Sequence, residues 1–216
     1  MLTVTTPPVN TRLVTTTDVA FELDALNSDY DSSYIYSYII PGVSAAIVNY
    51  CNRDFALTGY TETFRTTPHG GYTSTARDKL MLSRCPVATV TSVVEGTDDQ
   101  LVSGTDYELD PEAGFLFRLN GADSRDWTAP KITVSYTAGY LLPVESTPDI
   151  PSTLPDDIAR AAVLLARDWY MSRGRDVTMR SLTLDGVAAT FGTGNPGTSL
   201  PAHVEALLAP WRLAVL

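Results

Sequence analysis

Cysteine and histidine are both scarce in this 216-residue chain, which has two of each. A small secreted domain that depends on disulfides carries more cysteines, and a chain of this length can build a core without them. We therefore expect Cys51 and Cys85 to be buried free thiols in a reducing compartment. The cysteines and histidines are scattered and lack the spacing of a zinc site, so we expect no metal and no cofactor.

Basic residues are also few, with 15 Lys and Arg against 25 Asp and Glu and a net charge of −10. Binding to nucleic acid depends on cations that neutralise phosphates, so free nucleic acid and anionic membranes are disfavoured partners. Apolar runs are short, and none reaches the ~20 residues of a membrane span. The opening MLTVTTPPVN lacks the basic and apolar runs of a secretory signal, so we expect a protein that stays in a cytoplasm.

Catalytic motifs are missing as well. His69 lies in PHGGYTSTAR, but the sequence has no GxSxG motif, and neither cysteine lies in a recognisable nucleophile context. We expect His69 to be a solvated loop residue and His203 an exposed helix residue, and we expect no catalytic residues. A small hydrolase that uses His69 with a nearby Asp or Ser remains an alternative.

Four polar motifs are better explained by turns, loops and helix capping than by a metal, phosphate or catalytic site. Asp98-Asp99 and the turn Asp110-Pro111-Glu112 lack the ligand alternation and the glycine of a calcium loop. The glycine-rich GTGNPG at 192–197 has no following lysine to bind a phosphate. Asp156 and Asp157 are adjacent on a helix, so their carboxylates point in different directions and suit the positive end of that helix.

Helical periodicity is found at both ends of the chain. Residues 1–16 read as an extended arm, after which Thr17-Asp18 offers an N-cap for a short helix to about Leu26. A helical turn or two is expected before Pro41, and a firmer helix runs from Pro41 to about Asn52.

The clearest helix lies in LPDDIARAAVLLARDWYMSRGR, with a capping box of Thr153 and Asp156 and an end at Gly174. The last helix opens at Pro201. The apolar stripes predicted for these two helices are Ile158, Ala161, Ala162, Leu165 and Trp169, and Val204, Leu207, Leu208 and Trp211.

Between about Leu57 and Tyr140 the period becomes alternating. Six stretches rich in Val, Ile, Thr, Tyr and Phe are separated by turn residues, which predicts an antiparallel β module of about six strands. Asp185-Gly186 between alternating apolar residues predicts a hairpin. The stretches are YTETFRT, KLMLSR, ATVTSVVEG, DYELD, GFLFRL and KITVSYTAGY.

These patterns predict an α+β fold, a helical bundle of about four helices with an inserted antiparallel β module and a C-terminal β-hairpin plus helix. Residues 1–56 form the N-terminal arm and helices, and residues 57–141 the β module. Residues 142–216 form the long helix, the hairpin and the last helix, which pack with 17–56 as one helical domain.

The last six residues, WRLAVL, carry one charge and five apolar side chains. Chain termini are usually polar unless something binds them. Pro210 weakens the end of the last helix, so the segment after it is suited to ordering against a partner. The alternative is that the tail folds back on its own helices, which applies most to Val204, Leu207 and Leu208.

Four stretches, in order, resemble the head–tail connector proteins of tailed bacteriophages, also called adaptor or head-completion proteins, with relatives in gene transfer agents. They are IIPGVSAAIVNYCNRDF, LSRCPVATVTSV, ITVSYTAGY followed by LPDDIARAAVLLARDWYMSRG, and RSLTLDGVAATF followed by LPAHVEALLAPWRL. Together they cover most of the chain.

The resemblance implies a ring, usually of twelve subunits, beneath the portal protein in the neck of a virion assembled in the host bacterial cytoplasm. DNA passes through the lumen without specific binding, and a stopper or tail-completion protein binds the opposite rim. A tail-completion or terminator role in the same particle is the runner-up. The implied portal-docking residues are Leu207, Leu208, Pro210, Trp211, Arg212, Leu213, Val215 and Leu216.

Overall fold

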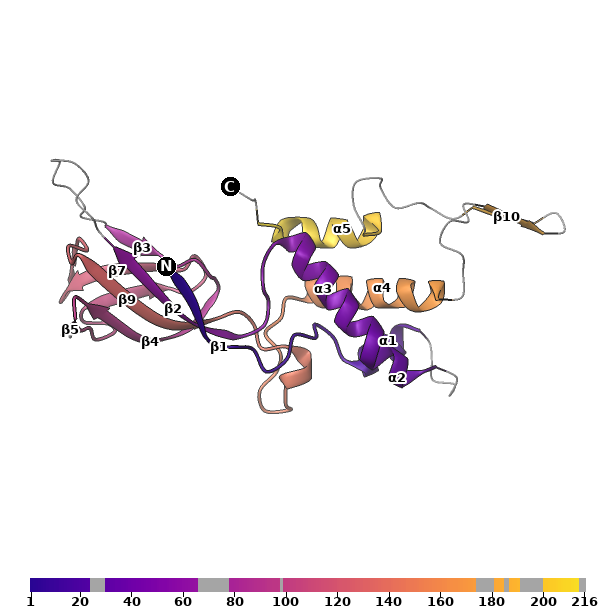
Figure 1. The fold of residues 1–216 in the computed structure, drawn as a ribbon, viewed down its shortest axis with the longest axis horizontal. Helices are drawn as coiled ribbons and strands as arrows, with labels where there is room; N and C mark the ends of the chain where they lie inside the picture. The colour runs from indigo at the N-terminus through magenta and orange to yellow at the C-terminus, as the bar shows by residue number, and fades with distance from the viewer. Residues whose placement is uncertain are drawn as a thin grey trace. The chain divides into compact units, whose positions relative to one another are not determined.

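The structure is a computed structural model that describes residues 1–23, 30–65, 78–97, 99–173, 181–184, 187–190 and 200–213, with the backbone alone at 181–184 and 187–190. The chain divides into two compact units. The β unit comprises Met1–Val9 and Ala56–Tyr140, and the helical unit comprises Asn10–Phe55 and Leu141–Leu216. Antiparallel sheets and helices share the chain (Figure 1), so the predicted α+β class is confirmed.

The first nine residues belong to the β unit, whereas the sequence pattern placed them with the N-terminal helices. β1 (Leu2–Thr6) pairs antiparallel with β2 (Thr58–Arg65). The N–H of Thr63 donates to the carbonyl of Met1 at 2.8 Å. Alternating Thr and Val favour a strand, but local sequence cannot name a partner strand that lies far along the chain.

The β unit contains a five-stranded sheet in the order β1-β2-β9-β4-β5. A second, four-stranded sheet has the order β3-β7-β6, with β8 paired to β7. Each of the six predicted stretches contains a strand, and the short β5 and β8 are additions that the sequence pattern did not reveal. The remaining bounds are β3 (Lys79–Met81), β4 (Val87–Glu95), β5 (Asp99–Gln100), β6 (Tyr107–Asp110), β7 (Phe115–Asn120), β8 (Asp123–Arg125) and β9 (Lys131–Ala138).

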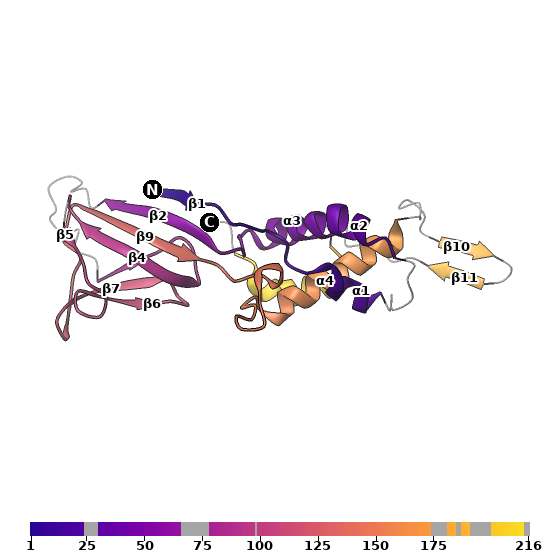
Figure 2. The ribbon, with the colours of Figure 1, turned by 90° about the horizontal axis from the view of Figure 1, so that it is seen from below.

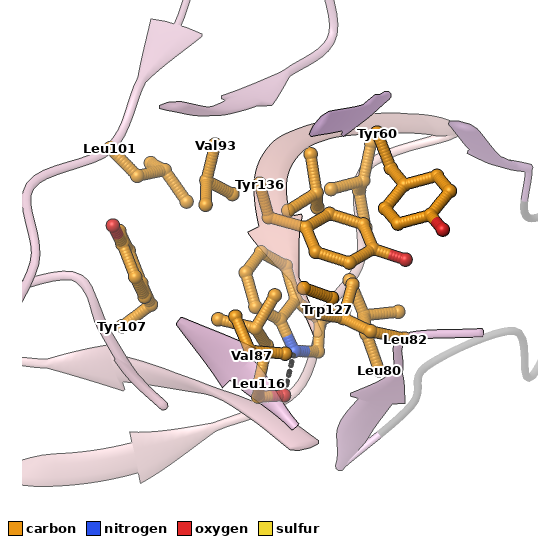
Figure 3. Packing of buried hydrophobic residues seen from close by; sticks show 13 residues of the cluster. Tyr60, Leu80, Leu82, Val87, Val93, Leu101, Tyr107, Leu116, Trp127 and Tyr136 are labelled. Atoms are coloured by element: carbon orange, nitrogen blue, oxygen red, sulfur yellow. Dashed lines mark hydrogen bonds between the residues drawn. The ribbon is translucent and has the colours of Figure 1, made fainter. Parts of the chain in front are cut away.

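Inward-facing side chains of these strands build the core of the β unit (Figure 3). Along β9, Ile132, Val134 and Tyr136 are buried and alternate with partly exposed residues, as the pleat requires. Trp127 is fully buried, and its indole N–H donates to the carbonyl of Leu116 at 3.1 Å. The large ring is therefore buried with its polar atom satisfied.

Glu62 is a buried carboxylate within the β unit. It accepts hydrogen bonds from the N–H of Ser83 at 2.9 Å, from the hydroxyl of Ser83, and from the hydroxyl of Tyr136 at 3.1 Å. Burial raises the pKa of Tyr136, and the neighbouring Glu62 raises it further, so the phenol stays a neutral donor. A buried charge is tolerated when donors surround it in this way.

The helical unit begins with α1 (Thr16–Glu22), which starts one residue before the predicted N-cap pair Thr17-Asp18. The N-cap is Thr15, whose hydroxyl accepts from the N–H of Asp18 at 3.2 Å. The Asp18 carboxylate in turn accepts from the N–H of Thr15 at 2.9 Å, which completes a capping box. α1 ends at Glu22 with Leu23 as its C-cap, short of the predicted end near Leu26.

The chain around Pro41 is continuously helical, whereas the sequence predicted separate turns before the proline. α2 (Ser32–Tyr34) leads into a π-helical turn, η1 (Ile35–Ile39), and then into α3 (Ile40–Cys51). Proline lacks an N–H and crowds the preceding turn, and the wider π turn accommodates it. Asn52 ends α3 near the predicted position, in the left-handed region with φ 52°.

η2 (Pro143–Glu145) precedes α4 (Asp156–Ser172), which has the predicted acidic first turn. The predicted capping box is wrong: Pro155 is the N-cap, and the Thr153 hydroxyl accepts from the N–H of Leu141 instead. Gly174, the predicted end, lies outside the described residues. The predicted stripe faces the core, with Trp169 half-buried and the others fully buried: Ile158, Ala161, Ala162 and Leu165.

The hairpin consists of β10 (Ser181–Leu184) and β11 (Val187–Thr190), with Leu184 opposite Val187. This register confirms the predicted hairpin, although Asp185 and Gly186 themselves lie outside the described residues. The last helix, α5 (Ala202–Leu208), continues into the 3-10 turn η3 (Ala209–Trp211). Within the described ranges, none of the helices has the length and hydropathy needed to span a membrane.

Candidate functional site

The C-terminal segment is the main candidate, and its first part serves the helical unit itself. α5 begins after Pro201 and packs against α4. Val204 and Leu208 are fully buried, one turn apart on the same face. Leu208 therefore belongs to the core of this unit, and we leave it out of the surface open to a partner. Leu207 and Trp211 are half-buried.

The chain after η3 lies against the end of α3. The N–H of Leu213 donates to the carbonyl of Cys51 at 2.9 Å. The last carbonyls of a helix have no partner within the helix, so this amide satisfies one of them. The Arg212 guanidinium lies 5.3 Å from the centre of the Tyr50 ring, at the negative end of the helix dipole.

The side chains of this segment remain largely open. Pro210 and Arg212 are exposed, and the Leu213 side chain is 42% exposed although its amide is bound. The backbone of Leu213 is therefore held against α3 while its apolar side chain stays partly exposed. Val215 and Leu216 of the expected docking set lie outside the described residues.

Two buried polar atoms near this segment lack hydrogen-bond partners among the described residues. They are Oε1 of Glu205 on α5 and Nε1 of Trp211 in η3. An unpaired buried polar atom costs about 1–3 kcal/mol.

Cys51 has no features of a nucleophile. Burial raises the pKa of its thiol to about 11, and the nearby Arg53 and Arg212 offset this only in part. The thiol is therefore protonated at neutral pH, and a protonated thiol is a poor nucleophile. No disulfide joins Cys51 to Cys85, and Cys85 is only partly buried, whereas the sequence led us to expect both thiols to be buried.

The other predicted candidates do not come together in the described structure. His203 lies 3.3 Å from the Asp168 carboxylate, and both side chains are substantially exposed. His69, Asp98 and the segment 192–197 lie outside the described residues. Asp110, Pro111 and Glu112 lie at the turn from β6 to β7, where Gly114 takes φ 70°. No group of three or more metal-ligating side chains is found within the described ranges.

A groove of about 460 Å³ lies between α1, η2 and α4. Val14, Phe21, Pro143 and Val163 give it an apolar lining, and Phe21 is 66% exposed. Glu22 forms the rim with ion pairs to Arg160 at 2.5 Å and to Arg167 at 3.2 Å. The sequence pattern did not reveal this groove because α1 and α4 are far apart in the chain.

The comparisons with known proteins agree with this architecture. A family model described as "Head completion protein" matches residues 13–214. The chain belongs to the head completion protein family. Nearly all of the described helical unit and the whole of Ala56–Tyr140 lie within that match. The head–tail connector resemblance seen in the sequence is thereby confirmed.

Solved structures share the fold. One is a chain from the neck of an empty GTA particle, computed with C6 symmetry, at 22% identity and a TM-score of 0.54. Another is from the virion of a native gene transfer agent particle, at 24% identity and a TM-score of 0.50. Each match covers 100% of this chain and 97% of the other. The search of curated proteins found no significant match.

A head–tail connector works by binding other proteins, so the relevant chemistry is contact between protein surfaces. The sequence pointed to the last apolar residues of the chain. It did not reveal that the Leu213 amide is bound to Cys51, because no local signal links residues so distant in the sequence.

Proposed function

We propose that this head completion protein is the adaptor of a tailed phage or phage-like particle. It forms a ring under the portal protein, of twelve subunits as the family resemblance implies. The ring extends the DNA channel and provides the platform for the stopper or tail proteins. Assembly takes place in the host bacterial cytoplasm, and the mature location is the neck of the virion. The role is structural and not catalytic.

The observation that carries this proposal is the family match over residues 13–214. Similarity of fold to chains from gene transfer agent particles, one of them from a neck, supports it. The acidic balance also suits a conduit, because a net charge of −10 does not retain the DNA that passes through it.

Docking to the portal uses the C-terminal segment from Leu207 onward, without Leu208. Pro210, Trp211, Arg212 and Leu213 present the contact surface, and Val215 and Leu216 extend it. Burying the three aliphatic side chains of the tail, those of Leu213, Val215 and Leu216, contributes roughly 1.5–3 kcal/mol each before the cost of ordering. Because every subunit of the ring makes the same contact, these modest contributions add up to tight multivalent binding.

Co-sedimentation of the purified chain with portal rings from the same particle tests the docking. The wild-type chain is expected to pellet with portal, and a chain lacking residues 213–216 is expected to stay in the supernatant while remaining folded by circular dichroism. Binding that persists after this deletion contradicts the docking proposal. A deletion that blocks tail joining alone, with portal binding intact, favours the terminator role.

The matched control is Val102→Ala, at a residue that is 60% exposed in the β unit. It removes apolar surface without touching the C-terminal segment. We expect this variant to bind portal like the wild-type chain, so that a loss on deletion is attributed to the tail and not to any apolar surface.

A further inference from the structure

The five-stranded sheet of the β unit ends in β1, whose outer edge is unpaired among the described residues (Figure 2). The N–H of Thr63 donates to the Met1 carbonyl, and the register places Thr3 opposite Thr61. Hydrogen-bonded pairs alternate along an antiparallel ladder. Residues 1 and 3 therefore bond to β2, and the N–H and C=O groups of Leu2 and Val4 face outward.

The two edges of this sheet differ in character. β5, at one edge, is two residues long and begins with Asp99. Short, charged edges are a common protection against pairing with other chains. β1, at the other edge, is LTVTT, with no charge and no proline, and Val4 is 54% exposed. Thr and Val favour strands, so this edge is ready to accept another strand.

The same chain contains a two-stranded hairpin that a third strand would stabilise. β10 and β11 pair with each other and with no other strand in the described sheets. A two-stranded hairpin is marginally stable in water, and a third strand stabilises it. Its strands, SLTL and VAAT, are uncharged and four residues long, a length that matches the free edge of β1. Neither the hairpin strands nor β1 carries a charged side chain, so no repulsion between charged side chains of these strands opposes their pairing.

We propose that the β10–β11 hairpin of a second copy of this chain adds to the free edge of β1. The addition is β-augmentation, in which main-chain hydrogen bonds supply the affinity. It joins neighbouring subunits by a continuous sheet and leaves the C-terminal segment free for docking. The inference rests on the proposed function, because it assumes that copies of the chain assemble side by side.

Two matched variants test which backbone groups matter. Val4→Pro removes the outward N–H, and Thr3→Pro removes an N–H that bonds to β2. Proline is tolerated at an edge strand where its nitrogen faces outward. We expect Val4→Pro to keep the melting temperature and weaken ring formation on portal by about tenfold, the loss that one or two hydrogen bonds account for. Thr3→Pro is expected to lower the melting temperature.

Disulfide trapping identifies the occupant, in a background with Cys51 and Cys85 replaced by alanine. Val4→Cys protein is mixed with Ala188→Cys protein, or with Thr183→Cys protein, assembled on portal and oxidised. Disulfide-linked dimers containing one chain of each kind are expected. Gln100→Cys at the β5 edge, mixed with the same hairpin variants, is the control and is expected to give no dimer.

These experiments distinguish a failure of the proposed function from a failure of the inferred strand addition. Wild-type chain that neither forms rings nor binds portal overturns the proposed function and this inference with it. Normal assembly of Val4→Pro without mixed dimers overturns the inference alone. A crosslink that forms only within single chains of a Val4→Cys/Ala188→Cys double variant also overturns it, since the hairpin then pairs with its own β1. Crosslinking of β1 to the portal protein assigns the edge to a different partner and overturns it likewise.

Discussion

The indole ring of Trp169 lies against the backbone of α3 at Gly42. A Cβ placed on Gly42 would be 2.8 Å from Cζ3 of that ring, closer than carbon atoms approach in proteins. The contact lets α4 bring its large half-buried side chain directly onto α3. Pro41-Gly42, which breaks helices in most settings, is here a place where α4 packs directly against α3.

Gly42→Ala should therefore destabilise the helical unit. Helix propensity alone predicts a gain of about 1 kcal/mol from replacing glycine inside a helix. Overpacking against the indole costs about 1–3 kcal/mol, so at all but the lowest cost the net change is a loss, of up to about 2 kcal/mol. Urea unfolding measures it. Trp169→Leu should suppress the loss in the double variant, and a stabilised Gly42→Ala single variant would refute the contact as the reason for this glycine.

The buried pair of Arg118 and Glu95 provides a second test. Their side chains are 6% and 8% exposed, and Nη2 lies 3.2 Å from Oε2. Nη1 also donates to the carbonyls of Asp106 at 2.5 Å and Leu119 at 2.9 Å, and it lies 3.6 Å from the Asp106 carboxylate. We expect Arg118→Met to cost about 3–5 kcal/mol, because it leaves the buried Glu95 carboxyl without its partner.

The double variant Arg118→Met/Glu95→Leu removes both charges at once. It should be distinctly more stable than Arg118→Met alone, as measured by chemical denaturation. Equal losses in the single and double variants would show that the contacts of Arg118 with the two backbone carbonyls and with the Asp106 carboxylate, and not its pair with Glu95, supply the stability.

Glu22 should make a small contribution to stability that depends on pH. Hydrogen bonding to Arg160 lowers the pKa of this carboxyl despite desolvation, and the charges of Arg160 and Arg167 add to the effect. A lowered folded-state pKa stabilises the protein above the unfolded pKa, and the contribution is lost as pH falls through the folded value. Both arginines are about half exposed, so solvent screening keeps it below about 1 kcal/mol.

Thermal melts of Glu22→Gln and wild-type protein between pH 3 and pH 7 measure this contribution. The variant should melt lower near pH 7, and the difference should vanish toward the acid end. High salt should shrink it. A difference that grows on acidification would have the wrong sign for a lowered pKa.

Within the C-terminal segment, Leu208 should contribute much more to the stability of the protein than residues 213–216 do. Leu208→Ala empties a fully buried position and should cost about 2–5 kcal/mol in unfolding free energy. Deleting residues 213–216 removes the hydrogen bond from Leu213 to Cys51 and should cost only about 1 kcal/mol. Denaturant midpoints of the two variants compare these costs, and the reverse order would show that the tail is part of the core.

Much of the fold could be predicted from local pattern. Ile158, Ala161, Ala162 and Leu165 recur at helical spacing, and burial of one face is a consequence of that spacing alone. Asp185-Gly186 predicted a hairpin, and the register of its strands agrees. The alternating stretches predicted strands, and the four motifs pointed to the head completion family. These features depend on residues close together in the sequence, where side-chain period and turn chemistry act directly.

Tertiary structure decided what local pattern leaves open. β1 pairs with the distant β2, the Leu213 amide caps α3 at Cys51, and Trp169 packs on Gly42. Thr153 bonds to Leu141 instead of capping α4. In each case the local sequence does not determine which of several possible partners a backbone or side-chain group contacts. The choice depends on which segments meet when the cores form, and a sequence read in short windows does not contain that information.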